Sequence, residues 1–240
     1  MKNICIDIGN TKTKIGIFEN SNLLETIILD VLNIENIENI IVENQIEHSI
    51  ISNVNESEEL LLQMLQIKTK LLTFNYLTKL PFQINYLTTS TLGLDRIALI
   101  AAAIHLNNDS NVLVISLGTC VTFEFLNRKK EYLGGAISPG LDMRLQAMNH
   151  FTAKLPLLSF KEPIEFNGNS TESCMQSGAY FGLLGEIKSR IELYEAKFGE
   201  TEIVLSGGNC FLFEKHLKKA LFAHPYLTLF GLNKILTYNV

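Results

Sequence analysis

The chain has 240 residues, which is enough for one large domain or two small ones. Hydrophobic residues make up 47% of it and charged residues 19%, a composition typical of a folded protein rather than a disordered one. The formal net charge is −5, and no cluster of Lys and Arg occurs. We therefore expect no binding to nucleic acid or to anionic membranes.

The N-terminus does not carry the pattern of a targeting segment. Its first apolar run ends at Asp7, after too few residues for the h-region of a signal peptide. No stretch approaches the roughly 18 apolar residues that a membrane-spanning helix needs. We expect a cytoplasmic protein with reduced thiols and no His/Cys metal site, because no C-x-x-C pair or metal-ligand histidine spacing occurs.

The first part of the chain predicts three strands followed by alternating helices and strands. Apolar or alternating segments with short polar turns indicate three consecutive antiparallel strands, at residues 2–9, 12–18 and 23–29. The pattern then predicts, in order, a helix at 34–46, a strand at 48–52, a helix at 56–66 and a strand at 70–74. The predicted order is β-β-β-α-β-α-β.

The second part repeats this plan after a helix at 92–106. Strands are predicted at 111–119, 120–126 and 131–138, then helices near 140–151 and 172–197, and a strand at 202–208. Because each part opens with a strand, a small-residue turn and a second strand, we predict a duplicated α/β fold with a ligand cleft between its halves. We place the two halves at 1–104 and 105–240.

The strongest local signal is Asp-Ile-Gly-Asn-Thr at residues 7–11, followed by Lys12 and Lys14. A carboxylate at the end of a buried strand is costly unless it is paired or close to a metal. The glycine that follows lets backbone N–H groups approach an anion, and Asp7 can hold Mg²⁺ through water. The segment is either a phosphate-binding loop or a plain hairpin turn that Asp7 caps.

Two further small-residue turns occupy residues 116–119 and 205–209. A Gly-Thr turn at the matching place of the second half could contact the same phosphates, and glycines at a strand end allow a ligand to approach closely. Each turn alone could be a tight hairpin. Together with the first loop they resemble the nucleotide site of the superfamily that includes sugar kinases, heat-shock ATPases and actin. No G-x-x-x-x-G-K-[ST] sequence occurs, so the site is not a P-loop.

Gly-Leu-Asp-Arg at residues 93–96 opens the apolar helix. Asp95 could cap that helix, form a surface ion pair, or act as a base beside an anion-binding Arg96. Asp142 and Arg144, just after a Pro-Gly pair, could likewise reach the active site or only mark the start of a helix.

These motifs belong to a longer ordered set that resembles the type III pantothenate kinases and runs over nearly the whole chain. The set comprises residues 7–14, Tyr86, and the segments 93–96, 117–122, 134–140, 151–156, 168–178 and 206–209. The resemblance implies a duplicated actin-like (ribonuclease H-like) ATPase fold, with two mixed five-stranded sheets flanked by helices. It also implies phosphorylation of pantothenate by ATP, the first step of coenzyme A biosynthesis, in a homodimer that uses Mg²⁺ and a monovalent cation, K⁺ or NH₄⁺.

The resemblance also assigns roles to individual residues. Asp95 matches the proton acceptor. The matches to ATP contacts are Asp7, Ile8, Gly9, Asn10, Thr11, Lys12, Thr13, Lys14 and Thr119. The matches to pantothenate contacts are Tyr86, Gly93, Leu94, Asp95, Arg96 and Thr171.

The chain departs from the family pattern at Ser116, where the family usually has an Asp that holds the monovalent cation. Losing a unit charge at about 4 Å costs about 4 kcal/mol at an effective dielectric near 20, so we expect a weak or absent cation site. The enzyme could work without K⁺, Glu124 on the next strand could compensate, or turnover could be slow or absent. A kinase with another hydroxyl substrate and a non-catalytic nucleotide-binding regulator are the competing functions.

Overall fold

The computed structural model describes residues 1–9, 12–52, 58–106, 109–217 and 220–240. Its residues form two compact units. The first unit comprises Met1–Asp109, Arg128–Leu133 and Tyr226–Val240, and the second comprises Ser110–Asn127 and Gly134–Pro225. These units describe packing, whereas the halves expected at 1–104 and 105–240 describe a repeated plan, so that division stays a prediction.

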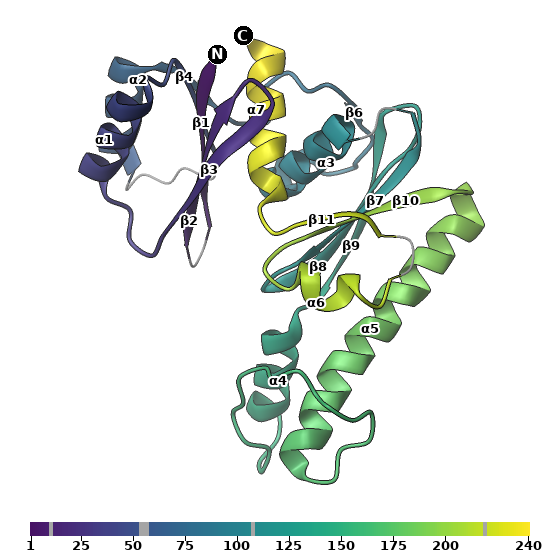
Figure 1. The fold of residues 1–240 in the computed structure, drawn as a ribbon. Helices are drawn as coiled ribbons and strands as arrows, with labels where there is room; N and C mark the ends of the chain where they lie inside the picture. The colour runs from purple at the N-terminus through teal and green to yellow at the C-terminus, as the bar shows by residue number, and fades with distance from the viewer. Residues whose placement is uncertain (10–11, 53–57, 107–108, 218–219) are drawn as a thin grey trace. The chain divides into compact units, whose positions relative to one another are not determined.

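The first unit is built on a five-stranded sheet of order β3-β2-β1-β4-β5 (Figure 1). The three predicted N-terminal strands form an antiparallel meander. The fourth strand pairs parallel with β1 and the fifth parallel with the fourth, as the alternating order requires. Their bounds are β1 Lys2–Ile8, β2 Thr13–Glu19, β3 Asn22–Leu29, β4 His48–Ser52 and β5 Lys70–Thr73.

The α-helices described in the first unit are α1 Ile34–Asn44, α2 Glu59–Lys68, α3 Leu94–Leu106 and α7 Leu227–Asn239. The side chain of Asn33 caps α1 by accepting a hydrogen bond from the backbone N–H of Asn36. Helix α3 is buried from Arg96 to Ile104 and packs against α7. Gly231 of α7 permits that packing, because a Cβ there would overlap the backbone carbonyl of Ala98.

The other sheet has the order β11-β10-β7-β8-β9-β6. Its bounds are β6 Gln83–Ile84, β7 Asn111–Leu117, β8 Cys120–Leu126, β9 Glu131–Pro139, β10 Thr201–Ser206 and β11 Ala220–His224. Five strands were expected, and the sixth is the two-residue β6, which pairs with the first residues of β9 inside the first unit. The antiparallel β7–β8 hairpin and the parallel β7–β10 pair match the repeated plan.

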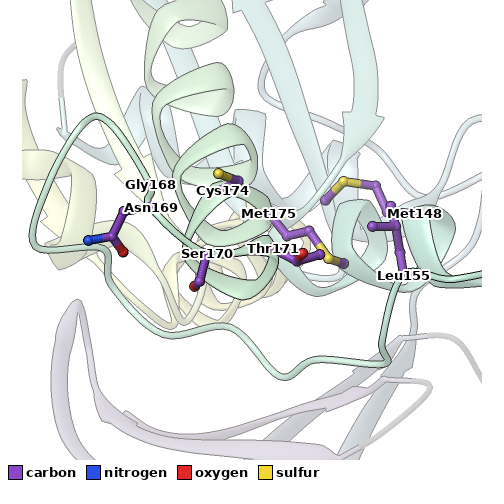
Figure 2. Close-up of a pocket in the computed structure, with 8 residues that line it drawn as sticks. All are labelled: Met148, Leu155, Gly168, Asn169, Ser170, Thr171, Cys174 and Met175. Atoms are coloured by element: carbon purple, nitrogen blue, oxygen red, sulfur yellow. The ribbon is translucent and has the colours of Figure 1, made fainter.

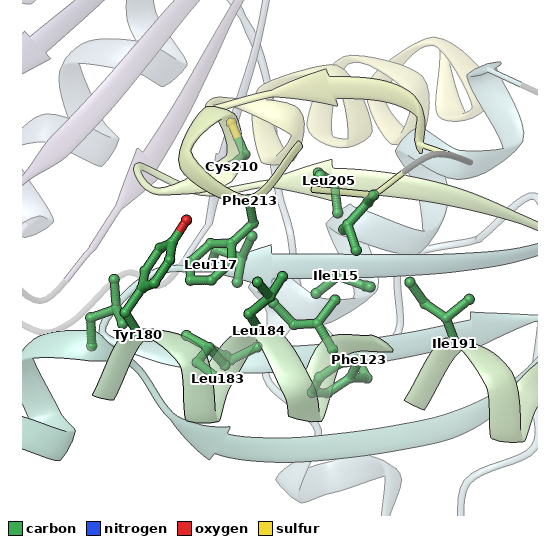
Figure 3. Close-up of a cluster of buried hydrophobic side chains, with 14 of the residues drawn as sticks. Ile115, Leu117, Phe123, Tyr180, Leu183, Leu184, Ile191, Leu205, Cys210 and Phe213 are labelled. Atoms are coloured by element: carbon green, nitrogen blue, oxygen red, sulfur yellow. The ribbon is translucent and has the colours of Figure 1, made fainter. Parts of the chain in front are cut away.

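The second unit contains α4 Leu141–His150, α5 Thr171–Phe198 and α6 Cys210–Glu214. Ser170 and Ser173 form a capping box that fixes the start of the 28-residue α5. One face of α5 packs on β7 and β8, and its buried Leu183, Leu184 and Ile191 belong to one apolar cluster with Ile115 and Phe123. Figure 3 shows this cluster, with Tyr180 of α5 next to Phe213 of α6. Alternation along the strands therefore places one apolar face of the sheet on α5.

The structure also contains elements that the sequence pattern did not predict, namely β6, α6, β11 and α7. All four cysteines are free. Within the part of the chain that the structure describes, no helix is both long and apolar enough to cross a membrane.

Candidate active site

Asp7 lies at the carboxyl end of β1, where its carboxylate accepts hydrogen bonds from neighbouring hydroxyls. The Ser52 hydroxyl at the end of β4 donates to Oδ1 at 3.0 Å, and the Thr228 hydroxyl in the first turn of α7 donates to Oδ2 at 3.3 Å. Strand register explains the first contact, because Asp7 is the direct neighbour of Ser52 on β4 and of Lys14 on β2. Asp7 is only 6% exposed, so its two oxygens are held in one orientation.

Asp7 is a buried acid, and a nearby cation would stabilise the ionised form of its carboxyl. Burial raises the pKa of the Asp7 carboxyl, and the charge of Asp95 raises it further. The charge of Lys14 and the hydroxyls of Ser52 and Thr228 lower the same pKa. The carboxylates of Asp95 and Asp7 therefore interact electrostatically within the first unit.

The loop after β1 is closed by a hydrogen bond from the Gly9 N–H to the Lys12 carbonyl at 3.1 Å. Lys12 itself is exposed, and its Nζ forms an ion pair with Asp30 at 3.1 Å. Ile8, Thr13 and Lys14 flank the loop on β1 and β2. The predicted contacts Asn10 and Thr11 lie outside the described residues. The role of the segment as a phosphate loop stays a prediction.

Asp95 lies in the first turn of α3, and its side chain is exposed, unlike that of the neighbouring Arg96. Its carboxylate folds back over Gly93, so that a Cβ at Gly93 would overlap Oδ1 of Asp95. The backbone N–H groups of Arg96 and Ile97 donate to the Gly93 carbonyl and begin the helix. Glycine at position 93 therefore lets the carboxylate stand at the solvent-facing start of α3, with Leu94 half-buried beside it.

Arg96 is 7% exposed and lies beside two aromatic rings of the first unit. Its Nη2 donates to the Tyr132 hydroxyl at 3.1 Å, and its guanidinium carbon is 5.8 Å from the centroid of the Tyr86 ring. Tyr86 and Tyr132 are stacked, with centroids 6.1 Å apart. The structure thus brings together Tyr86 and Arg96, both assigned to pantothenate by the resemblance, and adds Tyr132, which no sequence motif indicated. Their role in binding pantothenate stays a prediction.

Ser116 and Thr119 lie at the β7–β8 turn of the second unit. Ser116 is half-buried and has hydroxyl residues as neighbours on both adjacent strands, Thr122 on β8 and Ser206 on β10. Thr119 is exposed, and its carbonyl accepts from the N–H of Gly140 at 3.0 Å. The turn thus presents a row of neutral hydroxyls.

Two glycines let other loops approach this turn closely. A Cβ at Gly140 would overlap the backbone of Gly118 and Thr119, and one at Gly207 would lie 2.5 Å from the carbonyl oxygen of Leu117. Gly207 also has φ +84°, in the left-handed region that favours glycine. The predicted glycine turn after β10 therefore packs against the β7–β8 turn, within the second unit.

Glu124 is fully buried on β8, two residues beyond Thr122 and therefore on the same face of the sheet as Ser116. Its charge raises the pKa of Tyr194, which burial raises more strongly. Its place is compatible with compensation for the missing acid at Ser116, which stays a prediction.

Thr171 is the first residue of α5 and lines an open pocket of about 790 Å³ in the second unit (Figure 2). The pocket combines polar groups of the loop before α5 with the apolar side chains of Met148, Leu155 and Met175.

Asp142 and Arg144, which the sequence left open as active-site residues, both contact other residues of the second unit. The Asp142 carboxylate accepts from the Phe160 N–H at 3.0 Å, and Arg144 pairs with Glu186 of α5.

Asp7 fits the requirements of a magnesium ligand. An ionised carboxylate offers two acceptor oxygens, and Ser52 and Thr228 each donate to one of them and fix its place. Among the described residues, no three or more His, Cys, Asp or Glu side chains are grouped to hold a metal. The Asp7 carboxylate suits Mg²⁺, which keeps several waters and commonly binds one or two carboxylates together with phosphates.

The duplicated sheets place the chain in the class of proteins with an actin-like ATPase fold. Solved structures share this fold. A Campylobacter jejuni protein assigned to the Baf family superposes with a TM-score of 0.65 at 20% identity, covering 98% of both chains. The Lmo2764 protein from Listeria monocytogenes, a candidate N-acetylmannosamine kinase, gives 0.54 at 13% identity over 99% of both chains. At such identities these likenesses show the fold alone.

The sequence comparisons define the family. The sequence model of the type III pantothenate kinases matches residues 3–192. Two relatives named type III pantothenate kinase come from Christiangramia forsetii, 41% identical over 99% of this chain and 98% of the relative, and from Cytophaga hutchinsonii, 40% identical over 99% and 100%. The chain therefore belongs to the type III pantothenate kinase family.

Proposed function

We propose that this chain transfers the γ-phosphoryl group of ATP to the primary hydroxyl of pantothenate, forming 4′-phosphopantothenate in the first step of coenzyme A biosynthesis. Family membership supports the reaction. The observation that carries the mechanism is the pair of carboxylates in the first unit. Asp7 is buried and fixed, and Asp95 is exposed but close enough to perturb its pKa.

The two carboxylates have different surroundings and therefore different roles. Asp95 stands at the solvent-facing start of α3, where it can accept the proton of a bound hydroxyl as that oxygen attacks phosphorus. Asp7 is locked by Ser52 and Thr228, which suits a group that holds a cation in one place. Such catalysis depends mainly on positioning and on charge compensation.

Asp7 would hold Mg²⁺ through water, and the ion, when bound, supplies positive charge against the β- and γ-phosphates. Lys14, the cross-strand neighbour of Asp7, adds a fixed positive charge on the same edge. Ile8 to Lys14 and Thr119 are assigned to ATP, and Tyr86, Gly93 to Arg96 and Thr171 to pantothenate. The charged Arg96 would pair with the carboxylate of pantothenate.

Three further properties are part of the proposal. The protein acts as a homodimer in the cytoplasm. Ser116 presents a hydroxyl where the family usually has a charge, so the dependence on K⁺ or NH₄⁺ is weak or lost. Glu124 is the residue that would compensate if a dependence remains, because it lies on the same face of the sheet.

Ser116 also favours a second candidate, a nucleotide-binding homologue with little or no turnover. The presence of Asp7, Asp95 and Arg96 favours the kinase, since a protein that only binds nucleotide needs no base beside its phosphate loop. ATP binding without ADP formation at any concentration of K⁺ or NH₄⁺ would establish the second candidate.

The test is a coupled ADP-release assay with pantothenate, run with and without K⁺ or NH₄⁺. Asp95→Ala should lower turnover by about 10² to 10⁴, the usual contribution of a general base. Glu35→Ala is the matched control, because Glu35 is an exposed acid in the first turn of another helix of the first unit. Near-normal turnover of Asp95→Ala would remove Asp95 from the proposed role.

A further inference from the structure

We infer that Tyr132 is a positioning residue for Arg96 and thereby helps to set the affinity for the carboxylate of the acceptor substrate. The inference rests on the proposed function and extends it to a residue outside the recognised motifs. Tyr132 is fully buried, and its hydroxyl accepts a hydrogen bond from Nη2 of Arg96 at 3.1 Å. Arg96 is itself only 7% exposed, so this contact is made away from bulk water.

The chain path explains why Tyr132 reaches this place. Arg128–Leu133 follows β8 in the sequence yet packs in the first unit. There the start of β9 pairs with β6, with Tyr132 opposite Ile84, and the Asn85 N–H donates to the Tyr132 carbonyl at 2.9 Å. The same backbone pairing that places Tyr132 therefore also fixes the segment that carries Tyr86.

The guanidinium is consequently held on two sides. The Tyr132 hydroxyl takes one of its N–H donors, and the Tyr86 ring lies within the range of a cation–π contact, with the guanidinium carbon 5.8 Å from its centroid. The stacking of the two rings couples their positions. Because the guanidinium is planar with donors in a fixed fork, holding one edge orients the remaining donors.

This arrangement predicts a particular kinetic signature. The carboxylate of pantothenate is remote from the hydroxyl that reacts, so its interaction with Arg96 is made equally in the ground state and in the transition state. Loosening Arg96 should therefore raise KM for pantothenate and leave kcat nearly unchanged. A purely structural role for Tyr132 would instead lower the thermal midpoint or the active fraction without a selective change in KM.

The experiment is steady-state kinetics with varied pantothenate at saturating ATP and Mg²⁺. Tyr132→Phe removes one oxygen and keeps the ring, and it should raise KM about tenfold with kcat within about threefold, since a buried acceptor of a hydrogen bond from the charged guanidinium is lost. In an Arg96→Met background the same substitution should have no further effect on KM. Tyr194→Phe is the matched control, because Tyr194 stacks on Phe125 in the second unit, and its KM should stay at the wild-type value.

Tyr86→Leu provides a second variant, in which the ring beside the guanidinium is lost from a half-buried position, and it should raise KM in the same way. An unchanged KM in Tyr132→Phe, with wild-type enzyme that phosphorylates pantothenate, overturns the inference alone. An equal rise in KM when Tyr132→Phe is made in the wild-type and in the Arg96→Met background also overturns the inference alone. Wild-type protein that leaves pantothenate unmodified overturns the proposed function and this inference together.

Discussion

Replacing Asp7 by asparagine should change activity and stability in opposite directions. The amide has nearly the size of the carboxylate and can still accept from Ser52, but it has no charge. One unit-charge interaction at about 4 Å and an effective dielectric of about 20 is worth about 4 kcal/mol, or about three powers of ten in rate. We therefore expect turnover to fall about 10³-fold.

Stability should rise in the same variant. Burial raises the pKa of Asp7 in the folded protein, so the folded state binds a proton more tightly than the unfolded state does. The wild-type protein therefore loses stability as the pH rises from the unfolded pKa of Asp7 through its raised folded pKa. The amide of the variant does not titrate, so Asp7→Asn should melt at a higher temperature than wild type at pH 7, without nucleotide.

The assay is thermal unfolding of both proteins from pH 4 to pH 8, with and without ATP and Mg²⁺. The difference in melting temperature should grow with pH in the absence of ligand. ATP with Mg²⁺ should stabilise wild type more than the variant. A variant that melts below wild type at pH 7, or that keeps wild-type turnover, would refute the account of Asp7 as a buried, cation-binding acid.

Three further substitutions test other parts of the structure. Gly93→Ala should displace the Asp95 carboxylate and lower turnover about 10²-fold with little change in KM for ATP, measured by ADP release; unchanged turnover would contradict the role of the glycine. Gly231→Ala should cost about 1–3 kcal/mol in urea unfolding because its Cβ overlaps the backbone of α3, whereas Gly185→Ala on α5, with open space around it, should be neutral or stabilising. Ser116→Asp should make turnover dependent on K⁺ or NH₄⁺, and a variant as insensitive to salt as wild type would exclude position 116 from cation binding.

Much of the fold could be predicted because its signals are local. Apolar or alternating segments between polar turns predicted the β1–β2–β3 meander, and the register places Asp7 near the end of β1, opposite Lys14. The restart of the same plan at β7 and β8 was likewise visible in the sequence. Strands β1 and β7 are buried along nearly their whole length, so each stands out as a short apolar run between polar turns.

The elements that were missed depend on partners distant in the chain. Strand β6 has only two residues and exists through its pairing with β9. Helix α7 is apolar on most sides, because it packs against α3 and the first sheet, and so it lacks the polar face of an amphipathic helix.

The same reason limits what could be predicted of the site. Asp7, Asp95 and Arg96 stand in recognisable local motifs, and the structure places all three in the first unit. Thr228 contacts Asp7 across 221 positions of sequence, and Tyr132 contacts Arg96 across 36. Threonine and tyrosine in these surroundings are also ordinary residues of a helix start and a buried strand, so only the fold reveals them.

The most direct test of the central claim is mass spectrometry of the small molecules after incubation with ATP, Mg²⁺ and pantothenate. We expect 4′-phosphopantothenate to accumulate in a one-to-one ratio with ADP, and Asp95→Ala to slow the formation of both by about 10²- to 10⁴-fold while still binding ATP. Two results would contradict the proposed function. In one, the wild-type protein binds ATP but leaves pantothenate unmodified; in the other, it phosphorylates another hydroxyl compound in place of pantothenate.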